Sequence, residues 1–164
     1  MRSVNLSYES ANNDGPRGGR GITLVPRRGK VFVVSSPSGG GKTTVVHQAV
    51  RQLPSLVRSV SVTTRPPRHA ERNGIDYRFV SRTQFARLRA RGGLLEWATV
   101  HGADYGTPKA WVERQLSRGC DVILSIDVQG ARQVRRRYGA RAVLIFLLPP
   151  SLAALKRRLM KRRT

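Results

Sequence analysis

The 164-residue chain carries 31 Lys and Arg residues against 9 Asp and Glu residues, a formal net charge of +22 at pH 7. Its single cysteine, Cys120, excludes an internal disulfide and a structural zinc site of the four-cysteine or two-cysteine, two-histidine kind. No apolar run approaches the ~20 residues that cross a bilayer, and Met1 to Pro26 lacks the apolar core of a signal peptide. We therefore expect a cytoplasmic protein with no membrane partner.

The chain is expected to form one folded domain behind a basic tail. Residues 1–28 are rich in Ser, Asn, Gly and Arg without hydrophobic periodicity, which predicts a disordered tail. Residues 29–164 form the predicted domain. Within it, residues 29–58 and 108–150 alternate apolar strands with helices, whereas residues 59–107 are more polar and hold shorter elements. This pattern indicates a core with an inserted subdomain.

A glycine-rich loop follows the first predicted strand. The β-branched run Val31 to Val34 is typical of a buried parallel strand, and Lys42 to Gln52 is predicted to be a helix. Between them, SPSGGGKT matches the phosphate-binding pattern G-x-x-x-x-G-K-[ST] except at its first position, Ser36. A serine fits there if the backbone does not need positive φ. The predicted ATP- and phosphate-binding residues are Ser36, Pro37, Ser38, Gly39, Gly40, Gly41, Lys42, Thr43 and Thr44.

Two side chains of this loop are expected to carry its chemistry. Glycines let backbone N–H groups converge on phosphate oxygens, and the helix N-terminus adds a partial positive charge. Lys42 is predicted to contact the β- and γ-phosphates, and the Thr43 hydroxyl to ligate Mg²⁺ bound with ATP. A glycine-rich turn with a chance Lys-Thr is the alternative, which the preceding strand and the following helix disfavour.

Further strands and helices alternate in the second half of the chain. Strands are expected at Val122 to Ile126 and at Ala142 to Leu148, and helices near Pro108 to Arg118 and Gly130 to Tyr138. This alternation predicts an α/β fold with a parallel sheet flanked by helices, of the P-loop NTPase type.

The C-terminal end is strongly basic. No acidic residue follows Asp127, whereas Arg132 to Arg163 hold eleven Lys or Arg residues. Ser151 to Thr164 is predicted to be an amphipathic helix with Ser151 as its N-cap. A nucleic-acid partner is one interpretation of this charge. A solvated basic surface is favoured, because arginine replaces lysine even at positions typical of plain surface. The sequence does not indicate an oligomeric state.

The inserted segment contains a candidate anion site. Arg65 and Arg68 lie three residues apart in a proline-restricted turn, where two guanidinium groups can grip a phosphate bidentately. The Tyr77 hydroxyl can add a third contact. Alternatively, the arginines form a solvated turn and the tyrosine is a half-buried strand residue. The histidines lack metal-ligand spacing and are interpreted as structural, among them His101.

This segment resembles the GMP-binding region of the guanylate kinase family, in its blocks SVTTRPPR and NGIDYRFV. The similarity continues through LEWA, YGT and IDVQG, in the family's order, over about residues 30–162. It implies phosphoryl transfer from ATP to GMP, giving ADP and GDP. By this resemblance the GMP phosphate is held by Ser61, Arg65, Arg68, Tyr77 and Tyr105, the guanine is recognised by Glu96 and Thr107, and Asp127 lies near the acceptor nucleoside.

The base assignment also has a chemical rationale. Guanine presents N1–H and an exocyclic amine on one edge, and the Glu96 carboxylate accepts from both. Adenine presents an acceptor at N1, which the same carboxylate repels.

The resemblance also implies catalytic residues and two departures. Lys42, Arg158 and Arg162 are the expected catalytic cations, the two arginines lying on the lid side. Residues 151–164 correspond to the start of a lid, which we expect to be truncated at Thr164. Ser125 stands where the family usually carries an acid. The alternative function is therefore a catalytically impaired guanylate-kinase-like module that binds a nucleotide or a partner.

Overall fold

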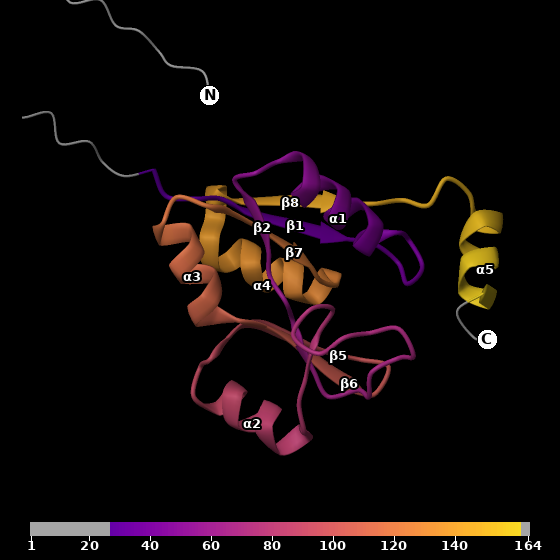
Figure 1. Cartoon of the computed structure of the whole chain (residues 1–164), viewed down its shortest axis with the longest axis horizontal. Coiled ribbons are helices and arrows are strands. Elements are labelled where there is room, and N and C mark those ends of the chain that lie inside the picture. Colours follow the sequence, from indigo (N-terminus) through magenta and orange to yellow (C-terminus); the bar gives the residue numbers. More distant parts are fainter. Residues whose placement is uncertain (1–26, 162–164) are drawn as a thin grey trace, which may run out of the picture.

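The structure is a computed structural model that describes residues 27–161, with side chains through residue 160 (Figure 1). Two sheets organise these residues, a larger α/β unit and a smaller unit beneath it. The tail expected for residues 1–28 lies outside the described residues except for its last two. None of the described helices is long and apolar enough to cross a membrane.

The larger sheet is parallel throughout. Its four strands lie in the order β2 (Leu56–Arg58), β7 (Asp121–Ser125), β1 (Val31–Ser35) and β8 (Ala142–Phe146). The central strand β1 pairs with β7 and β8 and buries Val31, Val33 and Val34 almost completely. This confirms the predicted P-loop type of parallel sheet. The predicted strand ends differ from the observed ends by one or two residues.

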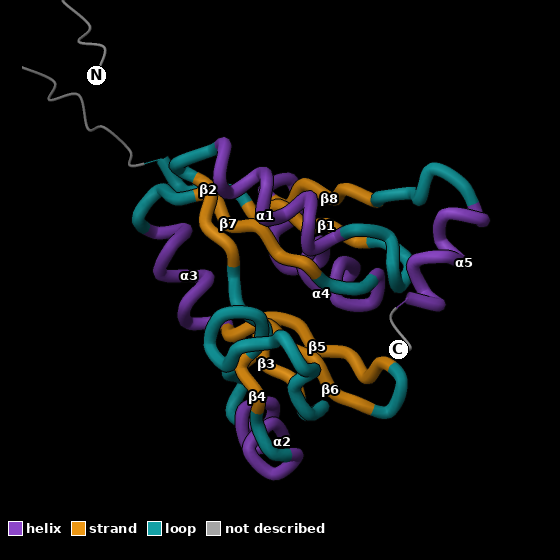
Figure 2. The backbone as a smooth tube through the Cα atoms, turned by 45° about the vertical axis from the view of Figure 1, so that its right-hand side comes forward, coloured by secondary structure: helices purple, strands orange, loops and turns teal. Residues whose placement is uncertain are grey.

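Helices cover both faces of this sheet (Figure 2). On one face, α1 (Lys42–Gln52) packs through Val46 against Val34 and Ile123. On the other face lie α3 (Lys109–Ser117) and α4 (Val128–Tyr138), which share a larger core cluster with the sheet. A 3-10 turn, η1 (Gly139–Arg141), joins α4 to β8.

The smaller unit is a mixed sheet inserted between β2 and α3. Its strands lie in the order β4 (Arg78–Phe79), β3 (Val62–Thr63), β6 (Ala103–Pro108) and β5 (Leu94–Val100). Helix α2 (Arg82–Ala90) begins with a capping box between Ser81 and Gln84. Its Phe85 packs against Val62 and Leu94, so this unit has an apolar cluster of its own.

The last described helix, α5 (Leu152–Lys161), leaves the sheet after β8 and lies apart from the other helices in Figure 1. The Ser151 hydroxyl accepts the Ala154 N–H at 3.1 Å, which confirms the predicted N-cap. A Cβ placed on Gly39 would lie 3.2 Å from Leu159 Cδ2 and 3.4 Å from Leu155 Cδ1. One apolar face of α5 therefore rests on the glycine-rich loop.

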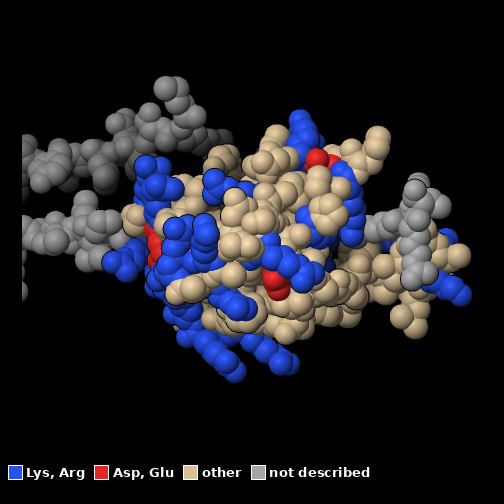
Figure 3. Space-filling view, turned by 90° about the horizontal axis from the view of Figure 1, so that it is seen from below, with Lys and Arg blue, Asp and Glu red and all other residues tan. Residues whose placement is uncertain are grey.

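The positive charge is largely exposed. Figure 3 views the molecule from the side of α2, and Lys and Arg side chains cover much of this face. Among the described residues, only three ion pairs with acids occur: Arg27–Asp121, Arg65–Glu71 and Arg137–Glu113. Most of these cations are thus balanced by solvent ions, and a nucleic-acid partner stays an untested prediction.

Candidate functional site

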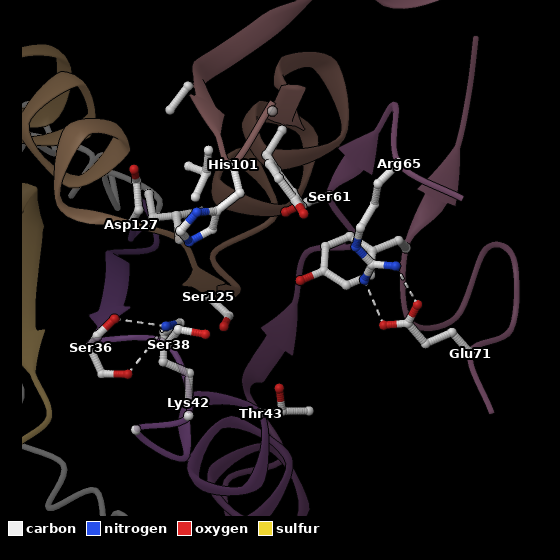
Figure 4. A pocket seen from close by; sticks show the side chains of 18 of the residues that line it. Ser36, Ser38, Lys42, Thr43, Ser61, Arg65, Glu71, His101, Ser125 and Asp127 are labelled. Carbon is white, nitrogen blue, oxygen red and sulfur yellow. Dashed lines mark hydrogen bonds and ion pairs between the residues drawn. The ribbon is translucent and has the colours of Figure 1, made fainter. Parts of the chain in front are cut away.

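A cavity of about 310 Å³ lies between the two sheets, a size within the range of small-molecule sites (Figure 4). One wall is the glycine-rich loop and the start of α1. The opposite wall comes from Ser61 just before β3, the turn after β3, and strands β5 and β6, and a third side comes from the end of β7. The cavity brings together most of the predicted site residues, namely Ser36, Ser38, Gly39, Gly40, Gly41, Lys42, Thr43, Ser61, Arg65, Arg68, Tyr77, Glu96, Tyr105 and Asp127.

The glycine-rich loop has the backbone that its sequence requires. Gly39 and Gly41 have φ of 79° and 92°, in the left-handed region that favours glycine. Ser36 is not among the described residues with positive φ, so its serine is accommodated without strain. The Lys42 side chain points back toward Ser36, and its Nζ donates to the Ser36 carbonyl at 2.8 Å and to the Ser36 Oγ at 3.2 Å. The ammonium group is thus held over the loop, where phosphates are expected.

Across the cavity, Arg65 is already engaged by an acid. Its guanidinium donates two hydrogen bonds of 2.6 Å to Glu71 and lies 4.9 Å from the centre of the Tyr77 ring. Glu71 also accepts the Arg68 N–H at 2.9 Å, so one carboxylate organises the whole turn. The hydrogen bonds from Arg65 lower the pKa of Glu71, and the same pair raises the pKa of Arg65. The pair therefore stays charged at neutral pH.

This pairing amends the expectation of two available guanidinium groups. Two donor nitrogens of Arg65 are occupied by Glu71, whereas its Nε is buried without a hydrogen-bond partner among the described residues. The exposed Arg68 lines the same cavity. Burial raises the pKa of Tyr77, so its hydroxyl keeps its proton and can donate. The turn offers an anion several donors at once.

Glu96 is a buried carboxylate in the middle of β5. It is 3% exposed, and its Oε1 accepts the Thr107 hydroxyl at 2.6 Å. Burial raises the pKa of Glu96 from its ordinary 4.5 to about 7, and the nearby Asp127 carboxylate adds to the rise, whereas the hydrogen bond from Thr107 lowers it. The ionised carboxylate is therefore costly to keep without a donor such as a ligand N–H.

A β-bulge aims Glu96 at the cavity. Leu94 pairs with Pro108 and Trp97 with Gly106, so β5 advances three residues while β6 advances two. The extra residue breaks the alternation, and Leu94, Leu95 and Glu96 are all buried. Bulges commonly re-aim a side chain beside a functional site.

The end of β7 supplies the third side. Asp127 caps α4, since its Oδ1 accepts the Gly130 N–H at 2.9 Å. Ser125 and Thr43 line both this cavity and a smaller adjoining one of about 70 Å³. No cluster of three His, Cys, Asp or Glu side chains suited to a metal ion occurs in residues 27–161. A metal that arrives with a nucleotide and takes hydroxyl oxygens fits this donor set.

Some predicted residues lie elsewhere. Thr107 is completely buried and contacts Glu96 instead of lining the cavity, and Pro37 and Thr44 are not among the lining residues either. Arg158 on α5 lies beside the loop, with one guanidinium nitrogen 3.6 Å from where a Gly41 Cβ would be. Arg162 falls outside the described residues.

Two ionisable lining residues were missed by sequence reasoning. Glu71 carried a signal, because an acid six residues from Arg65 in a tight turn is a natural partner for it. His101 was interpreted as structural, yet it lines the cavity from the turn between β5 and β6 with a φ of 50°. Only the fold brings it there.

The comparisons with known proteins agree on one family. Residues 28–164 match the family model described as guanylate kinase. The chain is 52% identical over 134 residues to a guanylate kinase of Ralstonia nicotianae, covering 82% of this chain and 60% of that protein. It is 50% identical over 134 residues to one of Cupriavidus metallidurans, covering 82% and 62%.

A solved structure supports the same fold. The crystal structure of guanylate kinase from Anaplasma phagocytophilum superposes with a TM-score of 0.71 at 38% identity, covering 82% of this chain and 68% of that one. The chain spans 60% and 62% of the length of the two curated relatives named above.

Proposed function

Because the chain belongs to the guanylate kinase family, we propose that it transfers the γ-phosphate of ATP to GMP, giving ADP and GDP. The observation that carries this proposal is one cavity with the glycine-rich loop on one wall and the Arg65 turn with Glu96 on the other. Phosphoryl transfer needs donor and acceptor in line, with their negative charge neutralised. A single cleft with Lys42 on one wall and Arg65 and Arg68 on the other meets both needs.

On the donor side, the loop N–H groups and Lys42 bind the ATP phosphates. The Lys42 ammonium, now hydrogen-bonded to Ser36, moves its donors to the phosphate oxygens when they arrive. The hydroxyls of Thr43 and Ser125 would hold Mg²⁺ bound with ATP, and the ion would supply charge neutralisation on the phosphates. Arg158 approaches the transferring group from α5. Arg162, outside the described residues, is kept as a second catalytic cation by the resemblance alone.

On the acceptor side, the phosphate of GMP sits among Ser61, Arg68, Tyr77 and Tyr105, next to the buried Nε of Arg65. Ionised Glu96 accepts from the guanine N1–H and amine, with Asp127 beside the nucleoside and Thr107 steadying the carboxylate. Adenine would leave this buried carboxylate unpaired. A mismatch of this kind is worth on the order of 10⁴-fold in selectivity.

A second candidate is a nucleotide-binding module with impaired catalysis. Ser125 favours it, because an uncharged hydroxyl lines the cavity beside Thr43 where an acid would attract Mg²⁺ more strongly.

The substrates and the single free cysteine suit the cytoplasm as the place of action. The exposed arginines are assigned to a solvated basic surface, which is favoured over a nucleic-acid partner.

The test is ADP formation from ATP and Mg²⁺ with GMP, AMP or UMP as acceptor. Turnover with GMP alone is expected, and Lys42→Ala should lower it by about 10²–10³-fold through loss of transition-state charge stabilisation. Lys30→Ala is the matched control, since Lys30 is exposed and does not line the cavity. GMP binding without turnover would support the second candidate. Lack of both GMP binding and turnover would refute both.

A further inference from the structure

The Glu96 carboxylate packs against the first turn of α4 at Gly130. A Cβ placed on Gly130 would overlap Glu96 Oε2, and it would lie 3.0 Å from Glu96 Cδ and 3.2 Å from Ile126 Cδ1. Gly130 is buried and is not among the described glycines with positive φ. Any residue could adopt its backbone conformation. Glycine is needed at this position because there is no space for a side chain beside Glu96.

A second contact joins the same helix to the backbone next to Glu96. Gln133, one turn further along α4, donates through Nε2 to the Trp97 carbonyl at 2.7 Å and accepts the Trp97 N–H on Oε1 at 3.2 Å. Trp97 directly follows Glu96 at the bulge of β5. The register of β5 against β6 shifts just before Trp97, and β5 is the edge strand of the smaller sheet. The two hydrogen bonds with Gln133 therefore hold the backbone at this irregular point.

Glu96 is thus constrained from three directions. Thr107 fixes one carboxylate oxygen, Gly130 sets how closely the other approaches α4, and Gln133 fixes the strand beneath it. The remaining open direction is the cavity, which Glu96 lines.

We propose that Gly130 and Gln133 are positioning residues that aim Glu96 and so set the preference for a purine that carries both N1–H and a 2-amino group. This inference rests on the proposed function, since it concerns how GMP is selected. Neither residue touches the base, and both act through the position of one carboxylate.

The Gly130→Ala variant should change the position of Glu96 without unfolding the protein. Alanine has a higher helix propensity than glycine, so α4 should persist. The atoms that must move are the far end of the flexible Glu96 side chain. The fold should therefore survive while the carboxylate turns away from its place.

The experiment measures binding of GMP and IMP to the full chain by calorimetry, because IMP keeps N1–H and lacks the 2-amino group. Wild type should bind GMP more tightly than IMP. Gly130→Ala and Gln133→Ala should each weaken the binding of GMP at least about tenfold and the binding of IMP less. The ratio of GMP affinity to IMP affinity should therefore fall towards one. The ATP affinity and the Tm of both variants should stay the same as in wild type. Gln48→Ala, an exposed glutamine on α1, is the matched control.

Rescue gives a further readout that general damage would not produce. Aspartate is one methylene shorter, so adding Glu96→Asp to Gly130→Ala should restore part of the GMP/IMP ratio relative to Gly130→Ala alone. An unchanged ratio in Gly130→Ala, an equal loss of both nucleotides, or no recovery in the double variant would overturn the inference. If wild type binds neither nucleotide, the proposed function and this inference fail together, whereas GMP bound equally by wild type and variant overturns the inference alone.

Discussion

Replacing Glu96 by glutamine should stabilise the protein at neutral pH while weakening its affinity for GMP. The pKa of Glu96 is about 7 in the folded protein against 4.5 ordinarily, chiefly because the carboxyl is buried. The folded state therefore keeps a proton that the unfolded chain gives up between these two values. Stability from this group is complete below about pH 4.5 and is lost as the pH rises to about 7.

The size of the effect follows from the same interval. Each pH unit between folded and unfolded pKa values is worth about 1.4 kcal/mol, so wild type should lose roughly 3 kcal/mol through this group between about pH 4.5 and pH 7.5. Glutamine cannot ionise and its amide oxygen can still accept the Thr107 hydroxyl. The variant should therefore avoid this loss and become more stable than wild type as the pH rises.

Urea unfolding of both proteins at about pH 4.5, 6 and 7.5 checks this prediction, with the difference between variant and wild type as the quantity compared. Glu113→Gln serves as the control, because it makes the same substitution on a carboxylate that is only partly buried on α3. If Glu96→Gln and wild type lose stability in parallel over this range, the buried carboxyl of Glu96 does not have the raised pKa on which this prediction depends.

Three other perturbations test separate parts of the structure. Glu71→Gln should weaken GMP binding about tenfold without affecting guanosine, because Arg65 loses the acid that holds it; an equal loss for guanosine would contradict a phosphate-side role. Phe85→Ala should cost about 3–5 kcal/mol in urea unfolding, since Phe85 is 1% exposed at the centre of the smaller cluster; a cost below about 1 kcal/mol would mean that this cluster is not a packed core. Ser125→Asp should lower the Mg²⁺ concentration for half-maximal turnover about tenfold, and no change would place the metal elsewhere.

The elements nearest the glycine-rich loop were predictable because their signals are local. The helix predicted over Lys42 to Gln52 has those same bounds in the structure, since a glycine loop precedes it and Pro54 follows it closely. The buried strand before it carries consecutive β-branched residues, as expected of a parallel strand covered on both faces.

Other features were beyond sequence reasoning because they depend on partners distant in the chain. Gln133 and Trp97 are 36 residues apart along the chain, and they are in contact only because α4 packs on β5. The place of His101 on the cavity wall depends likewise on how the smaller sheet sits against the larger one. No local pattern encodes either contact.

The sequence by itself predicted the class of sheet and the glycine-rich loop, since short-range periodicity and glycine spacing specify them, and its motif blocks carried the resemblance to the family. The tertiary structure decided the state of the site: Arg65 is paired with Glu71, and Glu96 is turned inward by a bulge and held against Gly130. The physical reason is that the ionisation and aim of a side chain depend on burial and on atoms that only packing brings within a few ångströms.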